Sequence, residues 1–215
     1  DFRQAWSLQK EEKFALGIST LLLEKQPDSA LLFLDQALQT LPESYLLRLS
    51  LARAYTATGK NKDALQACEE MLARNPQLPD VIKLKADLLD KENKPAEATL
   101  LWEKAYQLAP FDVELNYILA LRYAEAKDPR VLTICDSLIK ADTEGRHAEP
   151  YYYKGIYYSN LNDKTRALSL FDEAIRHDYY FLDGYIEKGS LYVEQKKYEE
   201  ALAVFNLALT ISPSF

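Results

Sequence analysis

A pattern of small and large apolar residues recurs six times along this chain at a nearly constant spacing. Most copies read alanine, a large apolar residue four positions later, a small residue three positions after that, and a proline five positions further on. The copies begin at Ala30, Ala64, Ala98, Val131, Ala167 and Ala201, at intervals of 34, 34, 33, 36 and 34 residues. Units this short cannot each enclose a core, so such a chain folds by stacking similar units against one another.

A second small residue lies about twelve positions before each copy, and a bulky residue usually follows it three positions later. These upstream anchors are Gly17, Ala52, Ala86, Ala120, Gly155 and Gly189. Within each half of a unit the apolar residues recur at steps of three and four, which predicts two amphipathic helices per unit. The small residues allow the paired helices to approach closely and the large ones fill the space between them. The proline ends the second helix.

This arrangement resembles the tetratricopeptide-repeat (TPR) family, whose 34-residue repeat carries a W-x2-L-G-x2-Y, A-x3-F and P signature. The resemblance extends from about Glu11 to Phe215, and the last unit, with Gly189, Tyr192 and Phe205, matches best. It implies an all-α, right-handed superhelical solenoid of antiparallel helix pairs. We expect a single domain over residues 1–215, with repeats at approximately 10–44, 45–78, 79–112, 113–147, 148–181 and 182–215.

Two units depart from the pattern. The first has one extra residue between its anchors, which we place in the turn around Gln26-Pro27-Asp28, and the fourth has a shortened turn at Lys127–Arg130 and no closing proline. Residues 142–150 form the most loop-like stretch and coincide with the 36-residue interval. We expect any bend of the superhelix to lie there.

Composition narrows the class of partner. The net charge of −7 is spread along the chain without a cluster of Lys and Arg, which argues against nucleic-acid binding. The longest apolar runs, such as Leu21–Leu23, are far shorter than the ~20 residues of a membrane-spanning helix. We therefore expect a soluble protein, either cytoplasmic or exported with its signal removed, and the sequence leaves the compartment open. Cys68 and Cys135 occupy equivalent inward positions two repeats apart, so we expect free thiols.

The residues needed for catalysis are scarce. His147 and His177 are the only histidines, and we interpret both as solvated surface residues. The sequence contains no Cys-x2-Cys, His-x3-His or glycine-rich phosphate loop. Carboxylate pairs such as Glu69-Glu70 fall on outer helices, where charges are usually solvated. We predict that the chain is not an enzyme, with no catalytic residues, no metal site and no cofactor.

In an open stack of helix pairs, the first helices of successive repeats line a concave groove that suits extended or helical peptides, and the resemblance implies the same use. With the Gly or Ala anchor as position 8, positions 2, 5, 9 and 12 share the face toward this groove. The predicted groove residues are Arg53, Lys83, Asp87, Tyr117, Leu121, Tyr152, Ile156, Ile186 and Ser190, and the same face adds Leu49 and Asp90.

Tyr117 and Tyr152 occupy the same groove position in adjacent repeats. Aromatic side chains with a polar tip are common at binding hot spots, so we expect both to contact a ligand unless they pack on each other. Position 2 is acidic in five repeats, at Glu11, Asp80, Glu114, Glu149 and Asp183. The helix dipole accounts for these carboxylates more simply than an acidic rim for a basic partner.

The predicted function is that of a scaffold or adaptor that binds a peptide or helical segment of a partner protein. The carboxylate clamp with which some TPR proteins hold chaperone C-termini is not assembled, because the corresponding positions carry other residues. Two alternatives stay open: a recognition or regulatory arm of a larger enzyme or sensor, and a groove for a small ligand or glycan. The sequence ends without a polar capping helix, so we expect either further sequence or a homodimer through the uncapped C-terminal end. The partner's identity is not encoded in any motif.

Overall fold

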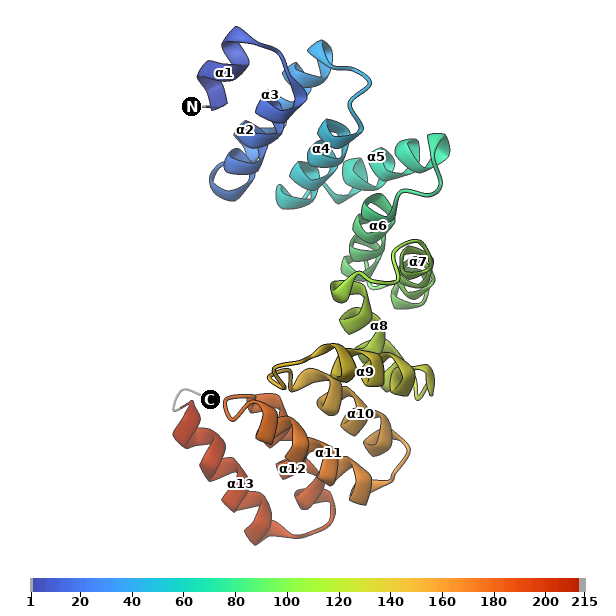
Figure 1. Cartoon of the computed structure of the whole chain (residues 1–215), viewed down its shortest axis with the longest axis vertical. Helices are drawn as coiled ribbons and strands as arrows, with labels where there is room; N and C mark the ends of the chain where they lie inside the picture. Colours follow the sequence, from blue (N-terminus) through green and yellow to red (C-terminus); the bar gives the residue numbers. More distant parts are fainter. Residues whose placement is uncertain (1, 213–215) are drawn as a thin grey trace. The chain divides into compact units, whose positions relative to one another are not determined.

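The computed structural model describes residues 2–212, and all regular structure in that range is helical (Figure 1). It contains α1 (Phe2–Leu8), α2 (Glu12–Lys25), α3 (Pro27–Thr40), α4 (Tyr45–Ala57), α5 (Asn61–Arg74), α6 (Pro79–Lys91), α7 (Pro95–Leu108), α8 (Val113–Glu125), α9 (Arg130–Ala141), α10 (Glu149–Asn160), α11 (Lys164–His177), α12 (Leu182–Glu194) and α13 (Tyr198–Ile211). From α2 onward the helices form six consecutive pairs, one for each copy of the sequence pattern. The all-α solenoid of helix pairs is thus confirmed. The predicted closing Pro213 and the predicted uncapped end lie outside the described residues.

Contacts divide the chain into two compact units, Asp1–Pro110 and Phe111–Phe215. The first unit holds α1 and the pairs α2/α3, α4/α5 and α6/α7, and the second holds α8/α9, α10/α11 and α12/α13. Within each unit, the two helices of every pair pack on each other and neighbouring pairs pack together, as α3 does on α4 and α11 on α12. The alternation of partners along the chain is what the repeat pattern requires.

The short helix α1 precedes the first repeat and was not predicted. Its Phe2 ring contacts Gly17 of α2 so closely that a Cβ there would lie 3.0 Å from ring carbons. Trp6 packs edge-on against Phe33 of α3, with ring centroids 6.1 Å apart. Because α1 has seven residues and lies outside the period, neither amphipathic spacing nor the repeat indicated it.

The small and large positions meet as predicted. A Cβ at Gly155 of α10 would lie 2.5 Å from the Phe171 ring of α11, and a Cβ at Gly189 would overlap the Phe205 ring in the same way. The two cysteines occupy buried positions as free thiols. Burial raises the pKa of Cys68 to about 11 and that of Cys135 to about 12, so both stay protonated at neutral pH.

The turns inside five of the pairs share one left-handed residue. Its φ is 75° at Gly59, 60° at Asn93, 57° at Lys127, 63° at Asn162 and 59° at Lys196. This conformation reverses the chain within a few residues and returns the second helix against the first. Glycine and asparagine adopt this conformation readily, whereas the two lysines, Lys127 and Lys196, carry a cost that glycine would avoid.

Our prediction of a longer turn in the first pair and a shorter turn in the fourth was wrong, because the helix boundaries shift. In the first pair only Gln26 separates α2 from α3, since the extra residue extends the helix and not the turn. In the fourth pair four residues, 126–129, separate the helices, and α9 begins only at Arg130. Helix ends shift easily because adding one turn satisfies further backbone hydrogen bonds. The closing prolines Pro42, Pro76 and Pro110 follow their helices as predicted.

Candidate functional site

The predicted groove residues all lie on first helices of their pairs. Arg53 is on α4, Lys83 and Asp87 are on α6, Tyr117 and Leu121 are on α8, Tyr152 and Ile156 are on α10, and Ile186 and Ser190 are on α12. Arg53 is exposed and the other eight are half-buried. The helices that carry them are therefore as predicted, and their side chains keep part of their surface accessible.

In the second unit, five aromatic side chains form a continuous row. The Tyr117 hydroxyl lies 3.0 Å from Nδ1 of His147, and the Tyr117 ring meets Tyr153 edge-on with centroids 6.4 Å apart. Tyr153 lies 5.7 Å from Tyr152, which meets Phe181 edge-on at 5.2 Å. We call these five residues the aromatic cluster. It joins α8, the α9–α10 loop, α10 and the α11–α12 connection.

Tyr152 also belongs to the core beneath the cluster. Its ring lies 5.9 Å from that of Phe171, and it packs with Ile156 against the buried group that contains Phe171 and Leu191. Tyr153 stands between Tyr117 and Tyr152, so the two predicted hot-spot residues are linked through a third ring. Sequence reasoning missed Tyr153 because it falls one position after the predicted groove face. The run Tyr151-Tyr152-Tyr153 was the signal that could have indicated it.

Burial and nearby carboxylates keep the cluster's hydroxyls protonated. Burial, followed by the charge of Glu149, raises the pKa of Tyr117 and of Tyr153 to about 12. Burial, followed by the charge of Glu187, raises the pKa of Tyr152 well above its ordinary value. The tyrosines are thus available as hydrogen-bond donors at any physiological pH, beside negative charge.

The α9–α10 loop is held in place by its own side chains. The Asp142 carboxylate accepts hydrogen bonds from the backbone N–H of Gly145 at 3.0 Å and of His147 at 2.9 Å. Nδ1 of His177 lies 2.6 Å from the Gly145 carbonyl oxygen, and its ring stacks on Tyr151 with centroids 4.3 Å apart. His147 is exposed, as predicted, and its Nδ1 also contacts Tyr117. His177 is half-buried and holds the loop, so our interpretation of His177 as a solvated residue was wrong.

Two residues of the predicted face in the first unit serve the fold. Leu49 is 3% exposed and belongs to the core of α4, α5 and α6, so it does not face a groove. The Asp90 carboxylate accepts a hydrogen bond from Nε1 of Trp102 at 3.0 Å, which ties α6 to α7. Asp87 forms an ion pair with Lys91 at 2.7 Å. The first unit thus offers less of the predicted surface than the second.

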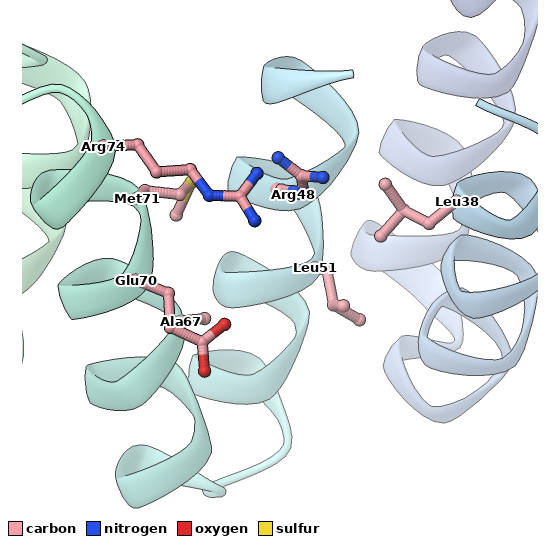
Figure 2. A pocket seen from close by; sticks show the side chains of 7 residues that line it. All are labelled: Leu38, Arg48, Leu51, Ala67, Glu70, Met71 and Arg74. Carbon is pink, nitrogen blue, oxygen red and sulfur yellow. The ribbon is translucent and has the colours of Figure 1, made fainter. Parts of the chain in front are cut away.

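The first unit has a different feature, a hollow between α3, α4 and α5 (Figure 2). It measures about 190 Å³ and is lined by Leu38, Arg48, Leu51, Ala67, Glu70, Met71 and Arg74. In Figure 2 the Arg74 side chain extends toward Arg48, and both arginines line the hollow. Sequence reasoning did not single out these arginines.

Among residues 2–212, no group of three or more His, Cys, Asp or Glu side chains could hold a metal ion. In the same range, every helix is too short or too polar to cross a bilayer.

The sequence matches two family models, both described as "Tetratricopeptide repeat", over residues 21–88 and 152–214. Together these segments make up more than half of the chain. Among curated proteins it is similar to "Anaphase-promoting complex subunit 7" of Arabidopsis thaliana, with 26% identity over 168 residues. That alignment covers 78% of this chain but only 30% of the relative's length.

Several solved structures share the fold. A tetratricopeptide repeat protein from Parabacteroides merdae has a TM-score of 0.77 at 17% identity, covering 93% of this chain and 79% of that one. MamA from Desulfovibrio magneticus RS-1 has a TM-score of 0.66 at 16% identity, covering 78% and 94%. YrrB, described as "a TPR protein with an unusual peptide-binding site", has a TM-score of 0.64 at 19% identity, covering 84% and 93%.

Proposed function

Because the chain belongs to the tetratricopeptide-repeat family, we propose that it is a protein-interaction scaffold whose second unit binds a segment of a partner protein through the aromatic cluster. The segment is a peptide or a helix, and the residues around the cluster extend its binding surface. These are Leu121, Ile156, Ile186 and Ser190. The observation that carries the proposal is the row of half-buried rings that joins α8, α10 and the α11–α12 connection.

The cluster has the physical properties of a binding hot spot. Its rings are anchored on one side, since Tyr152 packs on Phe171 and His147 is fixed by the Asp142 loop. Anchored rings lose little conformational entropy on binding, and their remaining exposed area is apolar with a polar tip. Rigid aromatic groups of this kind contribute disproportionately to affinity.

The charges beside the cluster favour a particular partner chemistry. Glu149 and Glu187 act on the tyrosine hydroxyls, and burial together with the charge of Asp183 raises the pKa of Glu187 itself. A Lys or Arg of the partner would relieve this crowding of negative charge, and its aliphatic stem would cover a ring. The preferred segment therefore combines an apolar side chain with a basic one.

Two of the similar proteins support this reading by their descriptions. YrrB is described as having a peptide-binding site, and the Arabidopsis relative is named as a subunit of a complex. TPR proteins are in general non-enzymatic scaffolds, which supports a binding role over catalysis. The alternative of a recognition arm uses the same surface, because an arm also works by holding a partner segment.

Site-specific photo-crosslinking tests the proposal on the full chain. A photoreactive amino acid at Ile186, on the predicted groove face of α12, should crosslink a partner in lysate of the source organism, and the same group at the exposed Leu202 of α13 should not. The crosslinked segment, read by mass spectrometry, should carry apolar and basic residues together. Crosslinks at Leu202 and none at Ile186 would place binding elsewhere.

Paired variants then separate ring contact from fold. Tyr117→Ala should weaken binding of the identified segment by about tenfold or more, the usual range for a hot-spot residue. Tyr198→Ala, which removes a tyrosine 59% exposed on α13, should leave binding unchanged. Tyr117→Phe keeps the ring and loses the contact with His147, so an intermediate effect is expected. Equal affinity of Tyr117→Ala and wild type, at equal helicity, would refute the assigned site.

A further inference from the structure

Two positions whose side chains pack against each other in the fifth repeat are both occupied by arginine in the second repeat. In the fifth repeat, the residue four before the Gly anchor is Tyr151 and the residue ten after the Ala anchor is His177. Their rings stack with centroids 4.3 Å apart. The same two positions of the second repeat carry Arg48 and Arg74. Two cations thus stand where the scaffold elsewhere places a stacked pair.

The equivalence of the positions holds in the structure as well as in the alignment of repeats. A guanidinium N–H of Arg48 donates to the carbonyl oxygen of Pro42, six residues earlier. In the sixth repeat the Tyr185 hydroxyl donates to the carbonyl oxygen of Tyr179, also six residues earlier, at 3.1 Å. Tyr185 is only 2% exposed, whereas the Arg48 side chain is 29% exposed. The slot that holds a buried tyrosine in the sixth repeat therefore holds a partly exposed arginine in the second.

Within the described part of the chain, Arg74 makes no polar contact that would give it a role in holding the first unit together. Among residues 2–212, the Arg74 guanidinium has no hydrogen-bond acceptor and no ion-pair partner, and Figure 2 shows it directed at Arg48. The carboxylate nearest to Arg48 is that of Glu43, at 4.0 Å and 87% exposed. Two like charges that face one another raise each other's energy, and an anion between them lowers it.

The arginines stand between two hollows on the same surface. The first is the hollow of about 190 Å³ described above, and an adjoining one of about 150 Å³ is lined by Tyr45, Arg48, Met71, Arg74, Asn75 and Leu78. Each is smaller than the ~300 Å³ at which small-molecule sites begin, so each suits one side chain of a peptide. Beside the arginines the larger hollow has an apolar wall of Leu38, Leu51 and Met71.

We propose that this hollow is a second binding site, in which Arg48 and Arg74 hold an Asp or Glu side chain of a partner peptide. The apolar wall takes an aliphatic or aromatic side chain adjacent to that acid. A carboxylate between two guanidinium groups receives two charge-assisted hydrogen bonds in the planar geometry that arginine presents. The site thus selects an acidic–apolar pair of residues, a chemistry opposite in charge to that proposed for the aromatic cluster.

The negative charge of Glu70 favours a carboxylate over a phosphate as the group bound by the two arginines. It lines the same hollow and accepts a hydrogen bond from Nε2 of Gln66 at 2.9 Å, so its charge remains close to the site. A phosphate group carries nearly two negative charges at neutral pH and is repelled by Glu70 more strongly than a carboxylate. The monoanionic side chain is therefore the favoured ligand.

Binding of defined peptides to the full chain tests the site. The probes are fluorescent nine-residue peptides, acetylated and amidated at their ends, with a central Glu-Leu pair in a Ser/Ala background. Matched versions replace the Glu by Gln or by phosphoserine, and one further version carries Gln-Leu with a free C-terminal carboxylate. Fluorescence anisotropy should show the Glu-Leu peptide binding about tenfold more tightly than the Gln-Leu peptide, as expected for hydrogen bonds to a charged group.

Three variants locate the discrimination. Arg74→Gln should abolish the preference for Glu over Gln without loss of helicity, since Arg74 makes no hydrogen bond or ion pair with the rest of residues 2–212. Lys62→Gln, the same charge change on the exposed surface of α5, should retain it. Leu51→Ala should weaken all the peptides alike. The proposal is overturned if no probe binds, if Arg74→Gln keeps the preference, or if the phosphoserine or free-carboxylate version binds best. Because these peptides test a site in the first unit, a negative result would not contradict the proposed binding role of the aromatic cluster in the second unit.

Discussion

Replacement of Gly155 by alanine tests the close approach of helices on which the repeat depends. The new Cβ would lie 2.5 Å from Cε1 and 2.7 Å from Cδ1 of Phe171. Carbon atoms prefer a separation of about 3.5–4.0 Å, so the methyl group is roughly 1 Å too close to the ring. Phe171 is fully buried and packs against Tyr152, which leaves the ring no open space to enter.

The expected magnitude is a balance of two effects. Overpacking of a core costs about 1–3 kcal/mol, and a site with no room to yield belongs at the upper end. Alanine in place of glycine gains about 1 kcal/mol in a helix. We therefore expect Gly155→Ala to lower the free energy of unfolding by about 1–2 kcal/mol.

Urea unfolding followed by far-ultraviolet circular dichroism measures the loss, which should appear as a lower midpoint at an unchanged slope. Gly184→Ala is the matched control, because its new Cβ would lie 3.1 Å from the flexible Ile175 side chain. This variant keeps the gain in helix propensity of alanine over glycine. The double variant Gly155→Ala/Phe171→Leu should recover part of the stability by making room. If Gly155→Ala is as stable as Gly184→Ala, the contact with Phe171 does not limit the approach of α10 and α11.

Two further substitutions test the turns and the charges. Lys196 adopts φ 59°, so Lys196→Gly should raise the free energy of unfolding by up to about 1 kcal/mol in urea titrations, whereas Lys197→Gly, at φ −91°, should not. Burial raises the pKa of Glu187, so its contribution to stability is present at low pH and is lost as the pH rises through the raised pKa. Glu187→Gln should therefore stabilise the protein relative to wild type at pH 7.5 and much less at pH 4; an equal difference at both pH values would contradict this assignment.

Sequence reasoning identified two of the five residues of the aromatic cluster. Tyr117 and Tyr152 were identified because they share one position of the repeat, and a repeat position specifies a helix face. Tyr153, His147 and Phe181 were missed because they belong to no such series. Tyr153 reaches Tyr117 only since α10 packs on α8, and His147 reaches it only because Asp142 folds the loop back. Leu49 was predicted to face the groove but is buried, because α5 and α6 pack around it.

The sequence by itself determined the helices of the repeats, their pairing and the close contact of small with large residues. These follow from apolar spacing and turn residues within about one 34-residue repeat, where the interacting groups are near in the chain. Only the tertiary structure decided which side chains meet beyond that range. Arg48 and Arg74 lie on different helices and show no pattern until α5 packs on α4, because the direction of a side chain depends on how each helix is rotated against its neighbour.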